Sequence, residues 1–491
     1  MALTFSRFNV WAEVDDQAAV FNGVSGSFTR MSRAERASVQ AFVEGGGPGE
    51  GTDALLTELV TRRVIVNDHA DEVAELRRRY DDDRWRSDTL GLTVVTSQGC
   101  NFACPYCFED KRPSVLKPAV ADAVVGIVED SLPSIRRLSL TWMGGEPLLG
   151  KGPLLALSER LIEVCRRHDK EYRASIITNG WHLDGATAAA LAAARVGWAQ
   201  VTVDGPPDVH DRTRPHATGG PTFERIVANL GEAADHLDIH VRVNVDTTNA
   251  HRVDELLALL AAAGLTGRIQ VALGRITDAT GNPAAPLASY GTACLTASQF
   301  GELELAFTAA AEVYGFAAPS PPRPMGSPCT AVRAKEIVVG ADGEMWKCWD
   351  DIGAPDQVIG TVFDYTVTNE RLDRWFTYHP ADEAQCSTCI AMPVCMGGCA
   401  HHHFNSADPE ARCGAFRHNH VGRITQVLER MMGVGPGDPV PLPRFDTPSM
   451  PRDTGAPTPV VLGPARRRRR AHAGEPASRG ASPRSGHRPA G

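Results

Sequence analysis

Short β-branched runs alternate with helical segments from about Leu92 onward, and this alternation is the strongest pattern in the chain. The runs are LTVVT near residue 92, LSLTW near 138, ASIIT near 174, AQVTV near 199, HVRVNV near 240 and RIQVAL near 268. Stretches rich in Ala and Leu, such as DGATAAALAAARV, separate them. Strands that alternate with helices build βαβ units and a parallel sheet. Six right-handed units predict an α/β fold, a partial (β/α)6 TIM-like barrel with ligands at the C-terminal ends of its strands.

The first 88 residues follow a different pattern, which predicts a small N-terminal β-rich domain. Short alternating runs, broken by Asp15-Asp16 and by Gly23 to Gly26, predict two or three strands. Helix-like stretches begin at Ser32 and span 53–61, and the strand-like VIVN follows near residue 65. Two roles fit this domain equally well. It either binds an extended leader peptide along a sheet edge or caps an incomplete barrel.

Changes in composition mark two further boundaries. The stretch PSPPRP near residue 319 separates the barrel, residues 89–318, from a cysteine-rich segment, residues 319–430. The remainder, residues 431–491, is rich in proline and carries five arginines at 466–470, which predicts a disordered tail. A run of arginines can contact nucleic acid or an acidic partner, but a solvated tail is the preferred interpretation.

The bulk composition is that of a globular protein with two or three domains, at 491 residues, 43% hydrophobic and 22% charged. The net charge of −9 gives no general attraction to nucleic acid or to anionic membranes. Apolar runs fall short of the ~20 residues that a membrane span needs, and the N-terminus does not resemble a signal peptide. We therefore expect a cytoplasmic protein with neither a membrane nor a nucleic acid as partner.

Ten of the twelve cysteines fall into two groups with short spacings, which in a reducing compartment indicates metal binding. The first group follows the first barrel strand and contains Cys100, Cys104 and Cys107, with Tyr106 directly before the last thiol. Three thiolates bind a 4Fe–4S cluster and leave one iron open. A zinc site or a redox pair fits less well. Zinc needs a fourth ligand, and a pair formed by Cys104 and Cys107 leaves Cys100 unused.

This motif, placed after the first strand of a βα-repeat domain, resembles that of the radical S-adenosylmethionine (SAM) superfamily. The resemblance implies that SAM chelates the open iron. It also implies that the turn after the second strand binds the amino group of SAM, through Gly144, Gly145, Glu146 and Pro147. Glycines let the backbone approach a ligand, and Glu146 can accept a hydrogen bond from the ammonium.

The resemblance implies three more SAM contacts at the ends of the third and fourth strands. There Asn179, Thr202 and Asp204 are expected to contact the carboxylate and ribose of SAM. Asn, Asp and Gly at strand ends are also ordinary turn residues, so both interpretations stay open. The loop from His210 to Arg214 follows and is expected to face substrate or water.

The second cysteine group has seven thiols between Cys329 and Cys413, and it is similar to the SPASM extension of radical SAM enzymes. The resemblance implies two auxiliary 4Fe–4S clusters, and thus three clusters in all. The implied ligands are Cys329, Cys348 and Cys399 for auxiliary cluster I, and Cys386, Cys389, Cys395 and Cys413 for auxiliary cluster II. Cluster I lacks a fourth cysteine, so its last iron is open or takes another ligand. Two zinc sites are the alternative.

Three further features fit neither cysteine group. Cys165 and Cys294 are interpreted as free thiols. The histidines 401–403 follow Cys399 and are interpreted as surface or substrate-facing residues, because the neighbouring cluster already has four cysteine ligands.

The SPASM resemblance implies an enzyme that acts on a peptide or protein. The expected function is that of a radical SAM oxidoreductase that installs a C–C or thioether cross-link, or a similar modification, in a ribosomally made precursor peptide. Two auxiliary clusters favour net oxidation, because they can accept an electron from the substrate. A flavodoxin- or ferredoxin-type protein is the expected electron donor. A non-enzymatic electron carrier would not need the GGEP turn.

The alternative function is that of an anaerobic sulfatase maturase, which oxidises Cys or Ser to formylglycine. Such enzymes often carry an acidic residue directly after the cysteine that corresponds to Cys348. Here Trp349 follows, and Asp350 and Asp351 come next. Either aspartate is a candidate general base.

Overall fold

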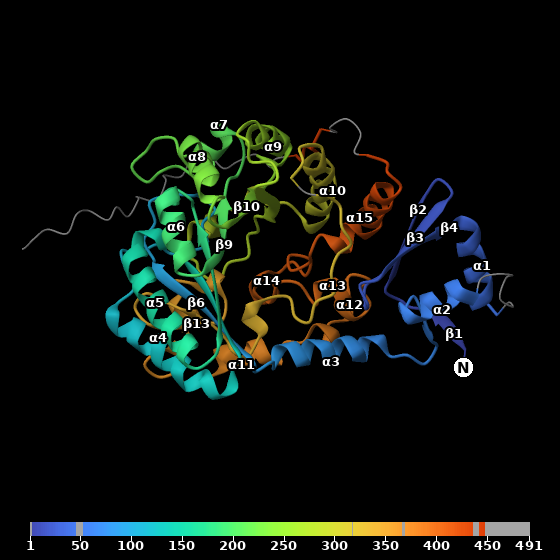
Figure 1. Cartoon of the computed structure of the whole chain (residues 1–491), viewed down its shortest axis with the longest axis horizontal. Coiled ribbons are helices and arrows are strands. Elements are labelled where there is room, and N and C mark those ends of the chain that lie inside the picture. Colours follow the sequence, from blue (N-terminus) through green and yellow to red (C-terminus); the bar gives the residue numbers. More distant parts are fainter. Residues whose placement is uncertain (1, 46–52, 317, 366–368, 436–440, 447–491) are drawn as a thin grey trace, which may run out of the picture. The chain divides into compact units, whose positions relative to one another are not determined.

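The structure is a computed structural model of the chain, and it describes residues 2–45, 53–316, 318–365, 369–435 and 441–446 (Figure 1). These residues belong to one compact unit, Met1–Val461. The five arginines at 466–470 and most of the predicted tail lie outside the described residues. Within the described part of the chain, no helix is both long and apolar enough to span a bilayer.

The six β-branched runs form six neighbouring strands of one sheet, in chain order. They are β6 (Thr89–Ser97), β7 (Arg137–Gly144), β8 (Glu171–Thr178), β9 (Val196–Thr202), β10 (Asp238–Val245) and β11 (Ile269–Arg275). Each strand pairs in parallel with the next. The predicted partial barrel is therefore confirmed. Cys100 and the GGEP turn both lie at the C-terminal ends of its strands.

Helices connect these strands and lie along the outer side of the sheet (Figure 1). They are α4 (Pro118–Ser131), α5 (Lys151–Arg167), α6 (Gly185–Ala193), α7 (Pro207–Thr213), α8 (Phe223–Ala233) and α9 (Val253–Ala262). In α5, Leu154, Leu157 and Leu161 recur at helical spacing and are all buried. They share one core with strand residues such as Leu140. This packing fixes the strand ends on which the site is built.

The barrel sheet continues into the cysteine-rich segment, which the sequence did not indicate. Strand β12 (Glu336–Val339) pairs in parallel with β6, and β13 (Glu344–Trp346) and β14 (Gly360–Thr361) extend the sheet with antiparallel pairs. Gly91 on β6 lies opposite Glu336. A Cβ at Gly91 would lie 1.6 Å from Oε2 of Glu336, so the glutamate side chain occupies the space that a side chain on β6 would need.

The C-terminal part of the chain consists of helices joined by tight turns. They are α10 (Ala297–Val313), α11 (Glu370–Thr377), α12 (Ala384–Ser387), α13 (Met392–Cys395), α14 (Ala400–Asn405) and α15 (Phe416–Met431). Between α13 and α14 the backbone turns through Met396, Gly397 and Gly398, all with positive φ. A Cβ at Gly398 would lie 1.8 Å from the carbonyl oxygen of Arg412. The turn therefore brings the cysteines around it close to the segment near residue 413.

The N-terminal segment forms the expected small β-rich domain. Its strands are β1 (Leu3–Phe5), β2 (Asn9–Val14), β3 (Gln17–Asn22), β4 (Phe28–Ser32) and β5 (Ile65–Asn67), and its helices are α1 (Arg33–Val43), α2 (Asp53–Thr61) and α3 (Glu72–Arg84). Strands β2, β3 and β4 form an antiparallel sheet, and β1 pairs with β5. Helix α1 begins with a capping box between Ser32 and Glu35.

The three-stranded sheet is buried on both faces. One face packs through Val20 and Met31 against α1 and α2. The opposite face packs through Val10 and Phe21 against α13 and α15. The rings of Phe21 and Phe416 meet edge to face, with their centroids 6.1 Å apart. The N-terminal sheet thus covers part of the cysteine-rich segment.

Candidate functional site

The three thiols of the first cysteine group converge on the loop that follows β6. The Sγ of Cys100 accepts a hydrogen bond from the backbone N–H of Phe102 at 3.4 Å. The backbone N–H of Cys107 donates to the carbonyl of Cys104 at 3.3 Å. Burial raises the pKa of Cys100 to about 12 and also raises that of Cys107. The positive charge of Lys111 acts on both thiols. Three converging thiols beside one ammonium fit an anionic cluster, because the lysine offsets the charge of the thiolates.

The glycines of the GGEP turn are required by the packing of two strand ends. Gly144 has a φ of +136°, and a Cβ there would lie 2.2 Å from the carbonyl oxygen of Ser97. A Cβ at Gly145 would lie 2.7 Å from the carbonyl oxygen of Gly99. The turn therefore lies directly against the backbone that leads into Cys100. This close packing is possible only because both residues lack side chains.

Glu146 joins the ends of β7 and β8. Its carboxylate is fully buried and accepts hydrogen bonds from Leu148 N at 2.9 Å, Thr178 Oγ1 at 2.8 Å and Asn179 N at 2.7 Å. Pro147 begins the turn that follows, and its carbonyl accepts from Thr96 Oγ1 at 2.9 Å. Three protein donors occupy much of the hydrogen-bonding capacity of Glu146. Its first role is to hold the turn and the third strand end together.

Asn179 lies beside the cluster loop, whereas Thr202 lies one strand further along. The amide of Asn179 donates to Asn101 Oδ1 at 2.8 Å and lies 3.9 Å from Cys100 Sγ. Thr202 ends β9 and is paired with Arg242 of β10. Asn179 is therefore the better placed of the two to contact a ligand on the cluster.

Asp204 is buried in a network that reaches back to the cluster loop. Its carboxylate accepts from the hydroxyl of Tyr106 and from Asn244 N at 3.1 Å. Arg214 donates to the Tyr106 hydroxyl at 2.7 Å. Burial raises the pKa of Asp204, and the charge of Arg214 opposes that rise. The network holds Tyr106, and hence the neighbouring Cys107, against the barrel.

The loop from His210 to Arg214 does not face substrate or water as a whole, which corrects the sequence-based expectation. His210 is fully buried, and its Nδ1 accepts from Asp204 N at 3.2 Å. Arg214 is 8% exposed and is held by Tyr106. Arg212 is exposed. Residues 210–213 belong to helix α7 and not to a loop, and this helix places His210 beside Asp204.

Four cysteines of the second group line one cavity. Cys386, Cys389, Cys395 and Cys413 line a small pocket, with Arg417 at its wall. Cys389 and Cys395 also pack with Phe21 of the N-terminal sheet. Four thiols around one enclosed space fit a fully ligated cluster.

Cys329, Cys348 and Cys399 gather at a second place in the C-terminal segment. The three thiols lie close enough for each charge to act on its neighbours, and burial raises the pKa of all three. The charge of Asp350 acts on both Cys348 and Cys399. The described residues therefore supply three thiols and a nearby carboxylate, which fits a cluster that lacks a fourth cysteine.

The two candidate general bases, Asp350 and Asp351, differ in burial and in the residues that surround them. Asp351 is 1% exposed, and its Oδ1 lies 3.2 Å from Nε2 of His401. Asp350 is half-buried. Burial raises its pKa, and the charges of His401 and Arg242 oppose that rise. Asp350 is therefore the carboxylate that faces the barrel strand β10.

The histidines 401–403 are not surface residues as a group, which corrects one of the two expectations, and the substrate-facing alternative stays a prediction. His401 is 1% exposed, and His402 and His403 are half-buried. His402 contacts Thr277 Oγ1 at 3.0 Å, and His403 contacts Arg412 at 2.6 Å. They point inward because α14 packs one side against the barrel end and the other against the turn near residue 412.

Both unassigned cysteines lie apart from the cysteine groups. Cys165 is buried at 1% exposure in α5. Cys294 is half-buried near the carboxylates of Asp278 and Asp246, which together with burial raise its pKa to about 12. Both fit free thiols.

Two polar residues near the cluster loop were missed by sequence reasoning. Glu109 is 3% exposed, its Oε2 has no hydrogen-bond partner among the described residues, and burial raises its pKa to about 8. Arg242 donates to Asn244 Oδ1 at 2.7 Å, and its guanidinium fills the space beside Gly274. The run HVRVNV carried a signal, because a charged residue between buried valines of a barrel strand indicates a lined interior.

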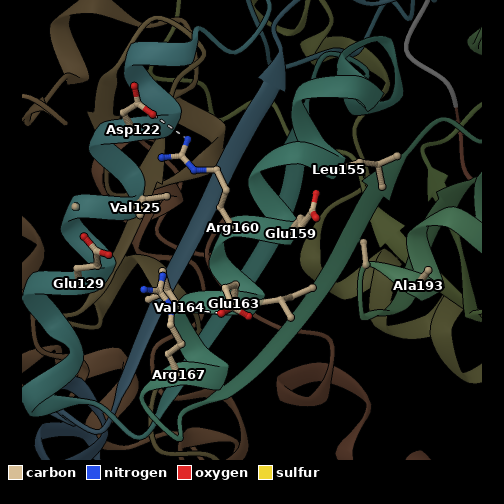
Figure 2. Close-up of a pocket in the computed structure, with 13 residues that line it drawn as sticks. Asp122, Val125, Glu129, Leu155, Glu159, Arg160, Glu163, Val164, Arg167 and Ala193 are labelled. Carbon is tan, nitrogen blue, oxygen red and sulfur yellow. Dashed lines mark ion pairs between the residues drawn. The ribbon is translucent and has the colours of Figure 1, made fainter.

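A large groove lies on the outside of the barrel between α4 and α5, and it is lined by other residues than the polar site described above. Figure 2 shows its lining, which includes the ion pair between Arg160 and Asp122, 2.8 Å apart. Glu163 pairs there with Arg167 at 3.5 Å. None of the residues that the sequence analysis assigned to a site lines this groove.

Comparison with known proteins agrees with this geometry. Residues 94–260 match the Radical SAM superfamily. The chain carries a radical SAM domain. The match begins in β6 and includes the three cysteines and the GGEP turn. Domains of this superfamily use SAM and a 4Fe–4S cluster, and the residues described above fit both.

Two curated relatives match parts of this radical SAM domain. The cysteine-type anaerobic sulfatase-maturating enzyme of Clostridium perfringens (strain 13 / Type A) is 31% identical over 149 residues, 28% of this chain and 38% of that enzyme. The S-adenosylmethionine-dependent nucleotide dehydratase of Fibrobacter sp. (strain UWH6) is 30% identical over 105 residues, 20% of this chain and 29% of that enzyme. The chain thus matches less than half the length of each. Their names point to different substrates, so these matches do not choose between substrate classes.

A solved structure extends the likeness to most of the chain. Native anSMEcpe with bound AdoMet and the Cp18Cys peptide covers 70% of this chain and 98% of that chain, with a TM-score of 0.53 and 18% sequence identity. At this identity the likeness shows a shared fold.

Proposed function

We propose that this protein is a radical SAM enzyme with three 4Fe–4S clusters that oxidatively modifies a ribosomally made peptide. The observation that carries the proposal is the gathering of the seven C-terminal thiols at two places. Four line one cavity, and three lie together beside Asp350. Two auxiliary clusters at these places would give the substrate an electron acceptor, which an isomerase does not need.

The chain's own residues bind and orient the reacting groups. Cys100, Cys104 and Cys107 would hold the SAM cluster, and the GGEP turn would hold the amino end of SAM. When bound, SAM and its cluster supply a 5′-deoxyadenosyl radical, which removes a hydrogen atom from carbon. Tyr106 and Asp204 keep the cluster loop in place, because their hydrogen bond joins that loop to the fourth strand end.

The overall reaction removes two hydrogen atoms from the peptide. One leaves with 5′-deoxyadenosine. The other leaves as a proton and an electron when the new C–C or thioether bond closes. Asp350 is the candidate proton acceptor, because it is less buried than Asp351 and faces the barrel. A cluster held by the C-terminal cysteines would supply the acceptor for the electron, and a redox protein of the flavodoxin or ferredoxin type would take the electron from it.

Anaerobic co-expression with short peptides encoded beside this gene tests the proposal. A modified peptide should lose two hydrogen atoms in mass, and the loss should disappear when Cys100, Cys104 and Cys107 are changed to Ala. Cys165→Ala is the matched control, since this thiol lies in α5 apart from both cysteine groups. Abundant 5′-deoxyadenosine with every peptide unmodified would reject the peptide as substrate.

Sulfatase maturation is the second candidate, favoured by the 31% identity with the Clostridium perfringens enzyme over 149 residues. The two reactions differ in what happens to sulfur. Conversion of a cysteine to formylglycine replaces its sulfur with an oxygen from water, whereas a thioether keeps the sulfur in the product. The mass of a cysteine-containing sulfatase peptide after incubation with the enzyme therefore separates the two functions.

We further propose that the N-terminal domain binds the leader of the peptide along β4. This strand ends the sheet order β2, β3, β4, whereas at the other edge Glu13 of β2 is held by ion pairs with Arg33 and Arg36. An exposed edge can accept an extended peptide as a further strand. Deleting the domain is a poor test, because the opposite face of its sheet packs through Phe21 on Cys389 and Cys395.

A photo-crosslinking side chain gives a sharper test. Placed at Arg30 on β4, it should capture the precursor peptide, and placed at Glu13 on β2 it should not. Both positions are exposed in strands of the same sheet, so they form a matched pair. If the peptide is captured equally at both positions, or at Glu13 alone, leader binding along β4 is wrong. The domain would then serve as a cap on the incomplete barrel.

A further inference from the structure

We propose that Asp350, His401 and His402 form a binding site for one divalent metal ion, separate from the iron–sulfur clusters. A carboxylate oxygen of Asp350 and one ring nitrogen of each histidine lie within 4.8 Å of one another. Asp350 lies in the 3-10 turn Trp349–Asp351, and both histidines lie in α14. Two imidazoles with one carboxylate are a donor set that zinc and iron(II) accept.

His401 has the surroundings of a metal-binding histidine. It is 1% exposed, yet neither of its ring nitrogens makes a hydrogen bond within the described ranges. Its Nε2 lies 3.2 Å from Oδ1 of Asp351, which is itself 1% exposed. With the Asp351 carboxylate beside Nε2, Nδ1 is the ring nitrogen left for a ligand.

His402 is also held in one tautomer. Its Nδ1 donates to the carbonyl oxygen of Ala411 at 3.1 Å, because a carbonyl can only accept. Its Nε2 therefore carries a lone pair, which accepts a hydrogen bond from Thr277 Oγ1 at 3.0 Å. A neutral imidazole with its second nitrogen fixed by a carbonyl is the form that binds metal.

The neighbouring cluster offers a competing explanation for Asp350. Its charge acts on Cys348 and Cys399, so Asp350 is also a candidate for the missing fourth ligand of auxiliary cluster I. That cluster lacks one ligand, whereas three donors converge here and two of them are imidazoles. Three donors are more than the one missing ligand of the cluster requires. In addition, His401 and His402 each have an oxygen atom of another residue beside the second ring nitrogen. Both observations favour a mononuclear ion.

The site lies at the junction of the C-terminal segment and the barrel. Thr277 follows β11, and the charge of Arg242 on β10 acts on Asp350. An ion with three protein ligands keeps a coordination position for a further donor. A thiol, carboxylate or carbonyl of a peptide is a donor of the right class. The existence of the metal site does not depend on the proposed peptide chemistry.

Zinc binding to the cluster-loaded protein tests the site. The protein is reconstituted anaerobically with iron and sulfide, desalted, given Zn²⁺ and desalted again. We expect about one retained zinc per chain, with nitrogen and oxygen neighbours near 2.0–2.1 Å by X-ray absorption at the zinc edge. His402→Ala should weaken zinc binding at least about tenfold, while iron content and the electron paramagnetic resonance of the reduced clusters stay unchanged.

His403→Ala is the matched control, since His403 belongs to the same helix but lies outside the three-residue group. It should retain zinc as the unaltered protein does. If His402→Ala fails to fold, Asp350→Asn takes its place, with circular dichroism as the check on folding.

Three outcomes would overturn the proposal. Sulfur neighbours near 2.3 Å would place the zinc on cysteines. Equal zinc retention in His402→Ala and in the unaltered protein would remove His402 from the site. A changed resonance spectrum or iron content in Asp350→Asn, with zinc retention unchanged, would assign Asp350 to the cluster. The base role of Asp350 is separable, because it predicts loss of product in Asp350→Asn but not in His402→Ala.

Discussion

Tyr106 donates its hydroxyl hydrogen to the carboxylate of Asp204, which lies 98 residues further along the chain. The tyrosine belongs to the cysteine loop after β6, and the aspartate follows β9. Arg214 donates to the same hydroxyl at 2.7 Å, so the tyrosine bridges two buried charges. The loop that carries Cys107 is therefore positioned by a polar contact across the barrel mouth as well as by packing.

Replacing Tyr106 by Phe should destabilise this loop. The change leaves the Asp204 carboxylate and the Arg214 guanidinium without their shared partner in a buried place, at a cost of about 1–3 kcal/mol. We expect a lower free energy of unfolding in urea and slower formation of 5′-deoxyadenosine by the cluster-loaded protein.

Tyr365→Phe provides the control for this change, because Tyr365 also donates to an aspartate, Asp130, but on the surface. Its removal should change stability by less than about 0.5 kcal/mol. If both variants lose a similar amount of unfolding free energy, the buried hydrogen bonds of Tyr106 contribute no more to stability than the surface contact of Tyr365.

His210 should make the folded protein less stable at mildly acidic pH. Burial, with the charge of Arg214, holds the pKa of His210 well below its ordinary value. When the pH falls below about 6.5, the unfolded chain binds a proton that the folded chain does not, so the free energy of unfolding decreases. His210→Asn should make this decrease shallower by up to about 1.4 kcal/mol per pH unit between about pH 7 and pH 5.5.

Urea unfolding of the cluster-loaded protein at a series of pH values measures this difference. The exposed His236 supplies the control, and His236→Asn should leave the pH dependence as it is. Parallel curves for His210→Asn and the unaltered protein would mean that the buried ring carries its proton in the folded state.

Adding a methyl group at Gly144 should disturb SAM binding. A Cβ there would lie 2.2 Å from the carbonyl oxygen of Ser97, and a φ of +136° is unfavourable for alanine. A strain of about 1–3 kcal/mol at this turn corresponds to a loss of about fivefold or more in SAM affinity. Equilibrium dialysis with labelled SAM measures it.

Gly126→Ala is the control for Gly144→Ala, because a Cβ at Gly126 in α4 would meet no atom within 4 Å. It should bind SAM normally and gain about 0.5–1 kcal/mol in stability, since alanine favours a helix. Unchanged SAM affinity in Gly144→Ala would show that the GGEP turn lies away from the ligand.

Iron content should report the three proposed clusters separately. Three 4Fe–4S clusters correspond to about twelve iron atoms per chain. Changing Cys386 and Cys389 together to Ala should remove about four of them and leave the spectrum of the SAM cluster unchanged. Cys294→Ala should lose none. A loss of all iron in the double variant would mean that auxiliary cluster II is needed for folding.

Much of the barrel could be predicted from the sequence, because its strands are short β-branched runs at regular spacing. The six runs, the helix at 53–61 and the strand near Ile65 all occur as expected. Strand β12 could not be predicted in the same way. Its four residues EIVV are too short for a periodic signal, and their partner on β6 is distant in the chain.

Site residues were predictable where the spacing of identical side chains carries the chemistry. Cys386, Cys389, Cys395 and Cys413 meet in one cavity as their motif implied. The partners of His401 could not be anticipated. The meeting of His401 with Asp351 depends on how a short turn and a six-residue helix pack across the end of the barrel, and local patterns do not encode such long-range packing.

The pairing of β6 with β12 also constrains the order in which the chain can fold during synthesis. The strand that leads into the SAM cluster loop pairs on one side with β7 and on the other with a strand that begins at Glu336. Until the ribosome has released that later segment, β6 remains an open edge with unpaired backbone groups, exposed to wrong pairing. Iron can therefore enter the first loop before the sheet that supports this loop is complete. We expect assembly factors and chaperones to bind the nascent chain at this stage.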